Sequence, residues 1–122
     1  MWTNNKRLGT AYEHKVCEAL RMDGYWVHFL TPDNRGAQPF DIIAVKNGRA
    51  IAIDCKTSTG HIFRISRLED NQKNAFELWR ARGNGEGLIL VEYERATYVI
   101  PYNLISEKGS IDLNNHEPLW RD

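Results

Sequence analysis

Apolar residues recur at helical spacing near the start of the chain and in strand-like runs after it. Between residues 6 and 23 they fall three or four positions apart, at Leu8, Ala11, Tyr12, Val16, Ala19 and Leu20. This spacing predicts an amphipathic helix that stops at Gly24. Residues 25–30 (YWVHFL) are rich in aromatic and β-branched residues and predict a strand, and residues 31–39 (TPDNRGAQP) have the composition of a loop.

Residues 40–57 (FDIIAVKNGRAIAIDCKT) carry the strongest local signal, because two apolar runs flank Asn47-Gly48. This dipeptide favours a two-residue hairpin turn, in which paired positions sum to 95 and Asp41 falls opposite Asp54. A four-residue loop would preserve this register, whereas a three-residue loop with a bulge would break it and a one-residue slip would turn Asp54 to the other face. Both faces of the hairpin are apolar, which predicts that it is central and covered on both sides.

The second half of the chain predicts a helix, a strand pair and a tail. Ser66 and Glu69 have the spacing of a capping box for a helix that runs to about residue 82 and stops at Gly83. Its inward stripe contains one polar member, Gln72; the stripe is Leu68, Gln72, Ala75, Phe76 and Trp79. Residues 87–93 and 96–100 predict an antiparallel pair. We expect a short helical turn near Leu104 and then an irregular tail that could dock on the chain's own core or on a second subunit.

The order of predicted elements is therefore α-β-β-β-α-β-β. With 122 residues the chain has the length of one domain, with a core over residues 6–101 and a tail over residues 102–122. No run approaches the length of a membrane span and the start lacks a signal-peptide pattern, so we expect no membrane partner and a cytoplasmic location. The two cysteines have neither the number nor the spacing of a disulfide framework or a zinc site.

The formal net charge is zero, which neither demands nor excludes a nucleic-acid partner. Any DNA contact must then come from local patches, although an ordinary solvated helix face explains most such charges. The candidates are Lys6, Arg7, Arg64, Arg67, Lys73, Arg80 and Arg82.

Two acids at the buried end of the hairpin, Asp41 and Asp54, point to a metal. Paired carboxylates there would repel and lose hydration, and a bound divalent cation removes that penalty. Hard carboxylate ligands suit Mg²⁺, with Mn²⁺ as a substitute. The direct ligands would be both aspartates and the backbone carbonyl of Cys55. Lys56 shares the face of Asp54 and could orient an attacking water or offset phosphate charge.

Two helix residues are expected at the edge of the same face as the carboxylates, so that the two helices cover the metal site together. Glu13 lies at the edge of the first helix's buried face and could hold a second metal or a metal-bound water, or could form a surface pair with Lys15 or Arg21. Gln72 could point toward the carboxylates or be satisfied by backbone groups. No residue pattern fits a Ser–His nucleophile, a P-loop or a dinucleotide fingerprint, so no nucleotide cofactor is expected.

The pattern of Glu13, Asp41 and Asp54-Cys55-Lys56 resembles the PD-(D/E)xK nuclease superfamily. Pro39 precedes Asp41 with one residue intervening, and Asp54 stands where Glu is commoner. Within that superfamily, GTAYEHKVCEALRMDGYWV and FDIIAVKNGRAIAIDCKTS look like the small Holliday-junction resolvases of archaeal and phage type. FRISRLEDNQKNAFELW, GLILVEY and ATYVIP are similar to RecU-type resolvases too, although the long RecU stalk insertion is absent. Both groups carry a glutamine on the helix after the D/E-x-K strand, which Gln72 matches.

The resemblance covers residues 6–101 and implies an α/β, restriction-endonuclease-like core: a central mixed five-stranded sheet with helices on both faces. It implies a Mg²⁺-dependent homodimer that makes paired nicks in four-way DNA junctions, and it allows a phage or prophage source. Archaeal members often carry a serine in the loop before the first aspartate. This chain offers Thr31 there, and Arg35 is a second candidate DNA contact.

Two alternatives stay open. One is another DNA nuclease of the same fold, such as a restriction-type enzyme or a repair nickase. The other is a catalytically silent DNA-binding domain. The presence of Glu13, Asp41, Asp54 and Lys56 together argues against the silent domain, because a module that only binds has no use for opposed buried acids.

Overall fold

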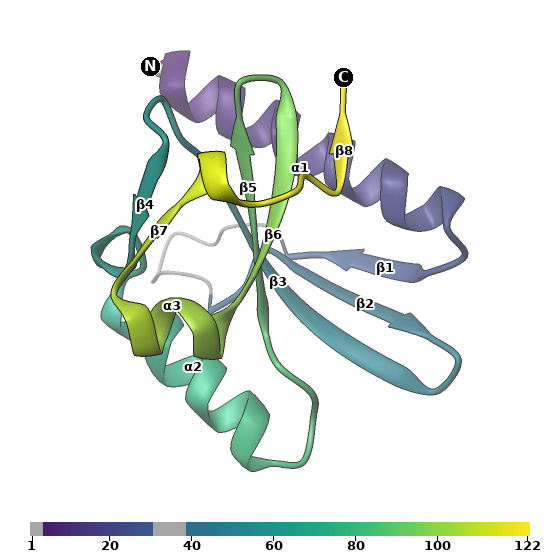
Figure 1. Ribbon diagram of the computed structural model, residues 1–122. Coiled ribbons are helices and arrows are strands. Elements are labelled where there is room, and N and C mark those ends of the chain that lie inside the picture. The colour runs from purple at the N-terminus through teal and green to yellow at the C-terminus, as the bar shows by residue number, and fades with distance from the viewer. Residues whose placement is uncertain (1–3, 31–38) are drawn as a thin grey trace.

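The computed structural model describes the backbone of residues 4–30 and 39–122, and the side chains of residues 11–30 and 39–122 (Figure 1). Its elements in chain order are α1 (Asn4–Met22), β1 (Trp26–Phe29), β2 (Ile42–Lys46), β3 (Arg49–Thr57), β4 (Ile62–Arg64), η1 (Ile65–Arg67), α2 (Asp70–Ala81), β5 (Leu88–Tyr93), β6 (Ala96–Pro101), α3 (Tyr102–Lys108), β7 (Ser110–Asp112), η2 (Leu113–Asn115) and β8 (Trp120–Arg121). Within the described residues, no helix has the length and apolar character needed to cross a membrane.

The main sheet is mixed, as predicted, but has six strands rather than five. Their order is β1-β2-β3-β5-β6-β8, with β3 and β5 parallel and the other neighbours antiparallel. The sixth strand comes from the segment that we expected to be an irregular tail. That expectation is wrong after α3: β7 pairs with β4 in a separate two-stranded sheet, and β8 pairs with β6. The tail is ordered because Ile111 and Leu113 are buried in the core.

The β2–β3 hairpin has the predicted register. Asn47 and Gly48 have φ values of 53° and 75°, the left-handed conformation that a two-residue hairpin turn of this kind requires. The pairs run from Lys46 with Arg49 to Ile42 with Ile53. Asp41 lies just beyond the last pair and its backbone N–H donates to the Ile53 carbonyl at 3.0 Å.

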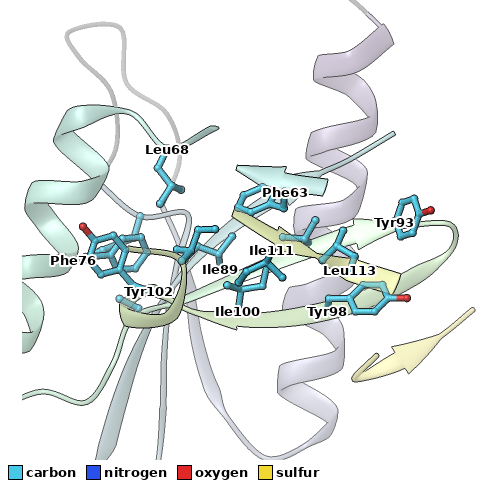
Figure 2. Close-up of a cluster of buried hydrophobic side chains, with 14 of the residues drawn as sticks. Phe63, Leu68, Phe76, Ile89, Tyr93, Tyr98, Ile100, Tyr102, Ile111 and Leu113 are labelled. Carbon is cyan, nitrogen blue, oxygen red and sulfur yellow. The ribbon is translucent and has the colours of Figure 1, made fainter. Parts of the chain in front are cut away.

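Helices cover both faces of the sheet, and α1 and α2 lie on opposite faces. α1 packs on the face that carries Ile42, Ile53 and Cys55. On the opposite face, α2, α3 and the small sheet enclose the larger core cluster (Figure 2). The expectation that Glu13 and Gln72 approach from the same face is therefore wrong, because alternate residues of β3 point to different helices. The β1–β2 part of the α2 face is also less well covered than predicted, since Ile43 and Val45 are only half-buried.

The start of α2 differs from the predicted capping box. Residues 65–67 form a 3₁₀ turn, and the helix begins three residues later than expected, with Glu69 as N-cap and Gln72 at N3. The Glu69 side chain accepts from the N3 backbone, and the Gln72 side chain accepts from the Glu69 N–H. A capping box is thus formed by Glu69 and Gln72 instead of Ser66 and Glu69. Leu68 is buried in an extended conformation, which prevents the helix from starting at Ser66.

Gly87 allows α2 to dock closely on the sheet. The Phe76 ring packs between Phe40 and Tyr102, with centroid distances of 5.0 Å to each. A Cβ at position 87 would overlap the Phe76 ring. The missing side chain at Gly87 therefore sets the position of the helix that carries Gln72.

Candidate active site

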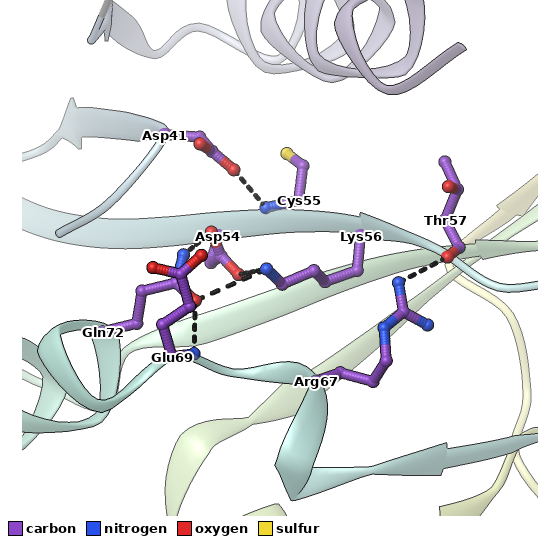
Figure 3. A network of polar contacts seen from close by, with 8 residues as sticks. All are labelled: Asp41, Asp54, Cys55, Lys56, Thr57, Arg67, Glu69 and Gln72. Carbon is purple, nitrogen blue, oxygen red and sulfur yellow. Dashed lines mark hydrogen bonds and ion pairs between the residues drawn. The ribbon is translucent and has the colours of Figure 1, made fainter. Parts of the chain in front are cut away.

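The candidate site lies where β3 extends past the end of β2. Residues 49–53 of β3 pair with β2, whereas residues 53–57 pair with β5 on the other side. Within the described residues, polar groups take the place of a strand beside residues 54–57. The Asp41 carboxylate accepts from the Cys55 N–H at 2.8 Å, and Arg67 donates to the Thr57 carbonyl at 2.9 Å (Figure 3).

Asp54 is the buried centre of this group, with a side chain 1% exposed. Its Oδ1 accepts from Gln72 Nε2 at 2.9 Å. Lys56 Nζ lies 3.3 Å from Oδ2, close enough for an ion pair but without hydrogen-bond geometry, so among the described residues Oδ2 accepts no hydrogen bond. Burial first, and then the negative charge of Asp41, raise the pKa of Asp54 well above its usual range, and the nearby Lys56 partly offsets this.

Asp41 is held beside Asp54 by the hairpin. The register places the two residues at the same end of the β2–β3 ribbon, and the hydrogen bond from the Cys55 N–H fixes the Asp41 carboxylate there. Its charge is the second cause of the raised pKa of Asp54. The structure thus brings together the two carboxylates that the hairpin register predicts.

Gln72 contacts three partners with one amide group. Nε2 donates to Asp54, whereas Oε1 accepts from the Glu69 N–H at 3.0 Å and from Lys56 Nζ at 3.4 Å (Figure 3). The sequence left open whether Gln72 points toward the carboxylates or is satisfied by backbone groups, and the structure shows both contacts. The amide satisfies the backbone at the start of α2 and also orients the carboxylate and the ammonium of the site.

Glu13 approaches from α1, on the opposite face of the sheet, beside the end of β3 that extends past β2. Its pKa is raised to about 7, first by burial and then by the charge of Asp41, with Lys56 acting in the other direction. The alternative surface pairs are not formed. Lys15 binds Glu92 and Asp122, and Arg21 binds Glu18.

The donor set fits a hard divalent cation. The described residues contain no cluster of three or more His, Cys, Asp or Glu side chains placed to hold a metal. Magnesium sites, however, often take only one or two protein carboxylates and fill the other positions with water and phosphate oxygens. Asp54 Oδ2 is buried and receives no hydrogen bond from the described residues, so a bound cation would compensate its lost hydration.

The predicted DNA contacts are scattered, and five of them lie in or next to β4 and α2: Arg64, Arg67, Lys73, Arg80 and Arg82. Arg67 is occupied by the Thr57 carbonyl and lies 5.7 Å from the centroid of the Phe63 ring, while Lys73 is 3.6 Å from Asp70. Arg64 is exposed on β4. The side chains of Lys6 and Arg7, and all of Thr31 and Arg35, lie outside the described residues.

Sequence reasoning missed two contributions to this site. Glu69 was expected inside the helix but is its N-cap, and through Gln72 it is linked to Asp54. Glu69 and Gln72 also have the spacing of a capping box, so the sequence contained a signal for Glu69 as the N-cap. The Thr57 carbonyl, which holds Arg67, left no signal in the sequence because any residue type supplies a carbonyl.

Comparison with solved structures defines the class of fold. The chain is similar to the structure of Hjc from Archaeoglobus fulgidus, a Holliday junction resolvase from an archaeal hyperthermophile, with 21% identity, 78% of each chain covered and a TM-score of 0.61. It is also similar to the structure of a bacterial homing endonuclease, with 15% identity, 100% of this chain and 83% of that chain covered and a TM-score of 0.59. The fold is therefore that of the restriction-endonuclease-like nucleases.

The family follows from the sequence. Residues 4–118 match the model of the archaeal Holliday junction resolvase (Hjc) family, which is most of the chain, and the protein belongs to that family. A search of curated proteins finds no match.

Proposed function

We propose that the protein is a Mg²⁺-dependent endonuclease that resolves four-way DNA junctions by paired, symmetric nicks. The family is one of Holliday junction resolvases, which supports a nuclease acting on DNA junctions. The observation that carries the chemistry is the buried Asp54. One of its oxygens accepts from Gln72, and the other lies beside Lys56 and accepts no hydrogen bond from the part of the chain that the structure describes.

In this proposal each side chain of the site has one task. Asp41, Asp54 and the Cys55 carbonyl would hold Mg²⁺, and Glu13 would hold a second ion or a water next to the first. When bound, the metal supplies charge neutralisation at the phosphate and lowers the pKa of water. Lys56 Nζ lies between Asp54 and Gln72, where it can donate to an attacking water or to a phosphate oxygen.

Gln72 acts on the other groups of the site. Its two ends fix the Asp54 carboxylate and accept from the Lys56 ammonium, so both keep their orientation before DNA arrives. A group held in advance does not have to be reorganised during the reaction, which is the main way in which charged sites accelerate phosphodiester hydrolysis. We therefore propose Gln72 as a positioning residue.

Paired nicks require two such sites, and we propose that the working form is a homodimer that places one site on each of two opposed strands. The net charge of zero means that the cationic surface for DNA has to be assembled locally.

Cleavage of a synthetic four-way junction, compared with a linear duplex of the same sequence, tests this function. We expect symmetric nicks in the junction with Mg²⁺ and none with a chelator. Metal-dependent cleavage of both DNAs at equal rates would instead support a general nuclease of this fold. Absence of metal-dependent cleavage of any DNA would refute both and leave a binding domain.

A further inference from the structure

β1 presents two aromatic side chains to solvent. Trp26 is 62% exposed, the largest exposed aromatic residue among those that the structure describes, and His28 is exposed two positions later. Their rings are nearly parallel, with an interplanar angle of 8° and centroids 6.1 Å apart. An exposed indole aligned with a second ring is a flat aromatic surface, and the fold makes no use of most of it.

This aromatic pair lies on the same face of the sheet as Asp54. Trp26 pairs with Val45, which pairs with Ala50, and His28 pairs with Ile43, which pairs with Ala52. Paired residues point to the same side, and so do alternate residues of one strand. Positions 50, 52, 54 and 56 of β3 therefore share a face with Trp26 and His28. The two other residues of β1, Val27 and Phe29, point to the α1 side and pack there.

The pair is also within reach of the same DNA as the site. Two residues along a strand span about 6.7 Å and neighbouring strands lie about 4.8 Å apart, which places His28 about 12 Å and Trp26 about 17 Å from Asp54. In Figure 1, α2 and α3 lie toward β5 and β6, and β1 and β2 extend away from them. Among the described residues, α2 and α3 therefore do not extend over β1, although Ala52, which lies between the site and the aromatic pair on this face, is itself buried.

The size and charge of this surface match a nucleobase better than a protein. One or two aromatic rings bury about 150–250 Å² each, far less than the roughly 800 Å² per partner of a stable protein interface. The cation nearest to Asp54 on this face is Lys56, which suits a polyanion. Aromatic side chains bind single-stranded nucleic acid by stacking on bases, and every base offers such a surface.

We propose that Trp26 and His28 form a stacking platform for an unpaired nucleobase at the branch point of a DNA junction; this rests on the proposed function. Bases inside a linear duplex are stacked on each other and cannot reach the platform. Where strands exchange, a base can leave its neighbours and stack on the indole. The platform thereby favours branched over linear DNA without reading sequence, and it fixes the distance from the branch to the scissile phosphate.

Binding measurements on the full chain test this platform. We would measure the affinities of wild type, Trp26→Ala, Trp26→Phe and Leu119→Ala for a four-way junction and for a linear duplex, in EDTA so that no cleavage occurs. Leu119 is the matched control, because it is 59% exposed and lies next to β8 at the opposite edge of the sheet. We expect Trp26→Ala to lose about tenfold in junction affinity, the scale of one base stack. Its duplex affinity should be unchanged, and Trp26→Phe and Leu119→Ala should behave as wild type.

A fluorescent base analogue, 2-aminopurine at the branch point, gives a second readout. Its emission should be quenched by wild type and by Trp26→Phe but not by Trp26→Ala. Equal losses of affinity for junction and duplex in Trp26→Ala, or no loss, would overturn the inference. The inference would also be overturned if Trp26→Ala sedimented as a monomer and wild type as a dimer, because this face would then be a contact between copies of the chain.

The inference and the proposed function fail in different ways. If wild type cleaves junctions and Trp26→Ala retains its junction preference, the platform is wrong and the nuclease stands. If wild type shows no preference for junctions, the junction-resolving function is overturned, and the platform with it.

Discussion

Replacing Glu13 with glutamine should stabilise the metal-free protein at neutral pH but not at acidic pH. The pKa of Glu13 is raised from its ordinary value of 4.5 to about 7, because α1 buries the carboxyl near Asp41. Between these two values the unfolded chain has lost the proton and the folded chain still holds it. Rising pH therefore favours unfolding across this window, and the effect is complete above pH 7.

The magnitude follows from the same shift. Each tenfold difference in proton affinity corresponds to about 1.4 kcal/mol, which gives an upper limit of about 3.4 kcal/mol for a pKa that moves from 4.5 to about 7. Glu13 is only half-buried, so solvent screens part of this, and we expect about 1–2 kcal/mol. Glutamine has nearly the same shape and no charge, so Glu13→Gln should recover this amount at pH 7.5.

Urea unfolding in EDTA, followed at pH 4.5 and at pH 7.5, measures this effect. Glu18→Gln is the control, because Glu18 is on the same helix but exposed. The expected result is a Glu13→Gln protein that is more stable than wild type at pH 7.5 and equal to it at pH 4.5, with no such difference for Glu18→Gln. A Glu13→Gln protein that is no more stable than wild type at pH 7.5 would refute the burial of this carboxyl near the site.

Three further substitutions test the parts of the site. Asp54→Asn keeps an oxygen for Gln72 but removes the negative charge, so cleavage of the junction should be lost while binding in EDTA is retained; full activity would show that the metal site is misassigned. Gln72→Ala leaves the Asp54 Oδ1 without its donor and removes half of the capping box, and should lower the free energy of unfolding by about 1–3 kcal/mol, whereas Asn74→Ala, at an exposed position of the same helix, should cost far less. Gly87→Ala should cost about 1–3 kcal/mol in urea unfolding because the new methyl group overlaps Phe76, and an equal cost for Gly85→Ala, where a Cβ meets nothing within 4 Å, would contradict this.

The hairpin and the pair of carboxylates could be predicted because their signals are local. Asn47-Gly48 fixes the turn, the turn fixes the register, and the register brings Asp41 to Asp54. The alternation of side chains along β3 then places Lys56 beside Asp54. None of these steps requires knowledge of a distant part of the chain.

The arrangement of the helices could not be predicted in this way. The sequence shows that α1 and α2 each have an apolar face, but not which face of the sheet each one covers. Glu13 and Gln72 were therefore expected on one side, although they approach the site from opposite sides. The regular structure of the tail depends in the same way on distant parts of the chain, because β7 forms by pairing with β4 and β8 by pairing with β6.

The position of the aromatic pair could have been read from the sequence. The alternation in YWVHFL places Trp26 and His28 together on one face of a strand, and the register of the next hairpin relates that face to Asp54. What the sequence does not show is that α2 stops short of this part of the sheet and leaves the two rings exposed.

The contacts of Gln72 have a consequence for how the enzyme should respond to heat. The first turn of a helix frays more readily than the whole domain unfolds, and here that turn supplies the donor to Asp54 and an acceptor for Lys56. Loosening of residues 69–72 would disorder the site while the sheet and its core remain intact. Activity should therefore decline at temperatures below the global melting transition, and it would report on the local stability of one helix end.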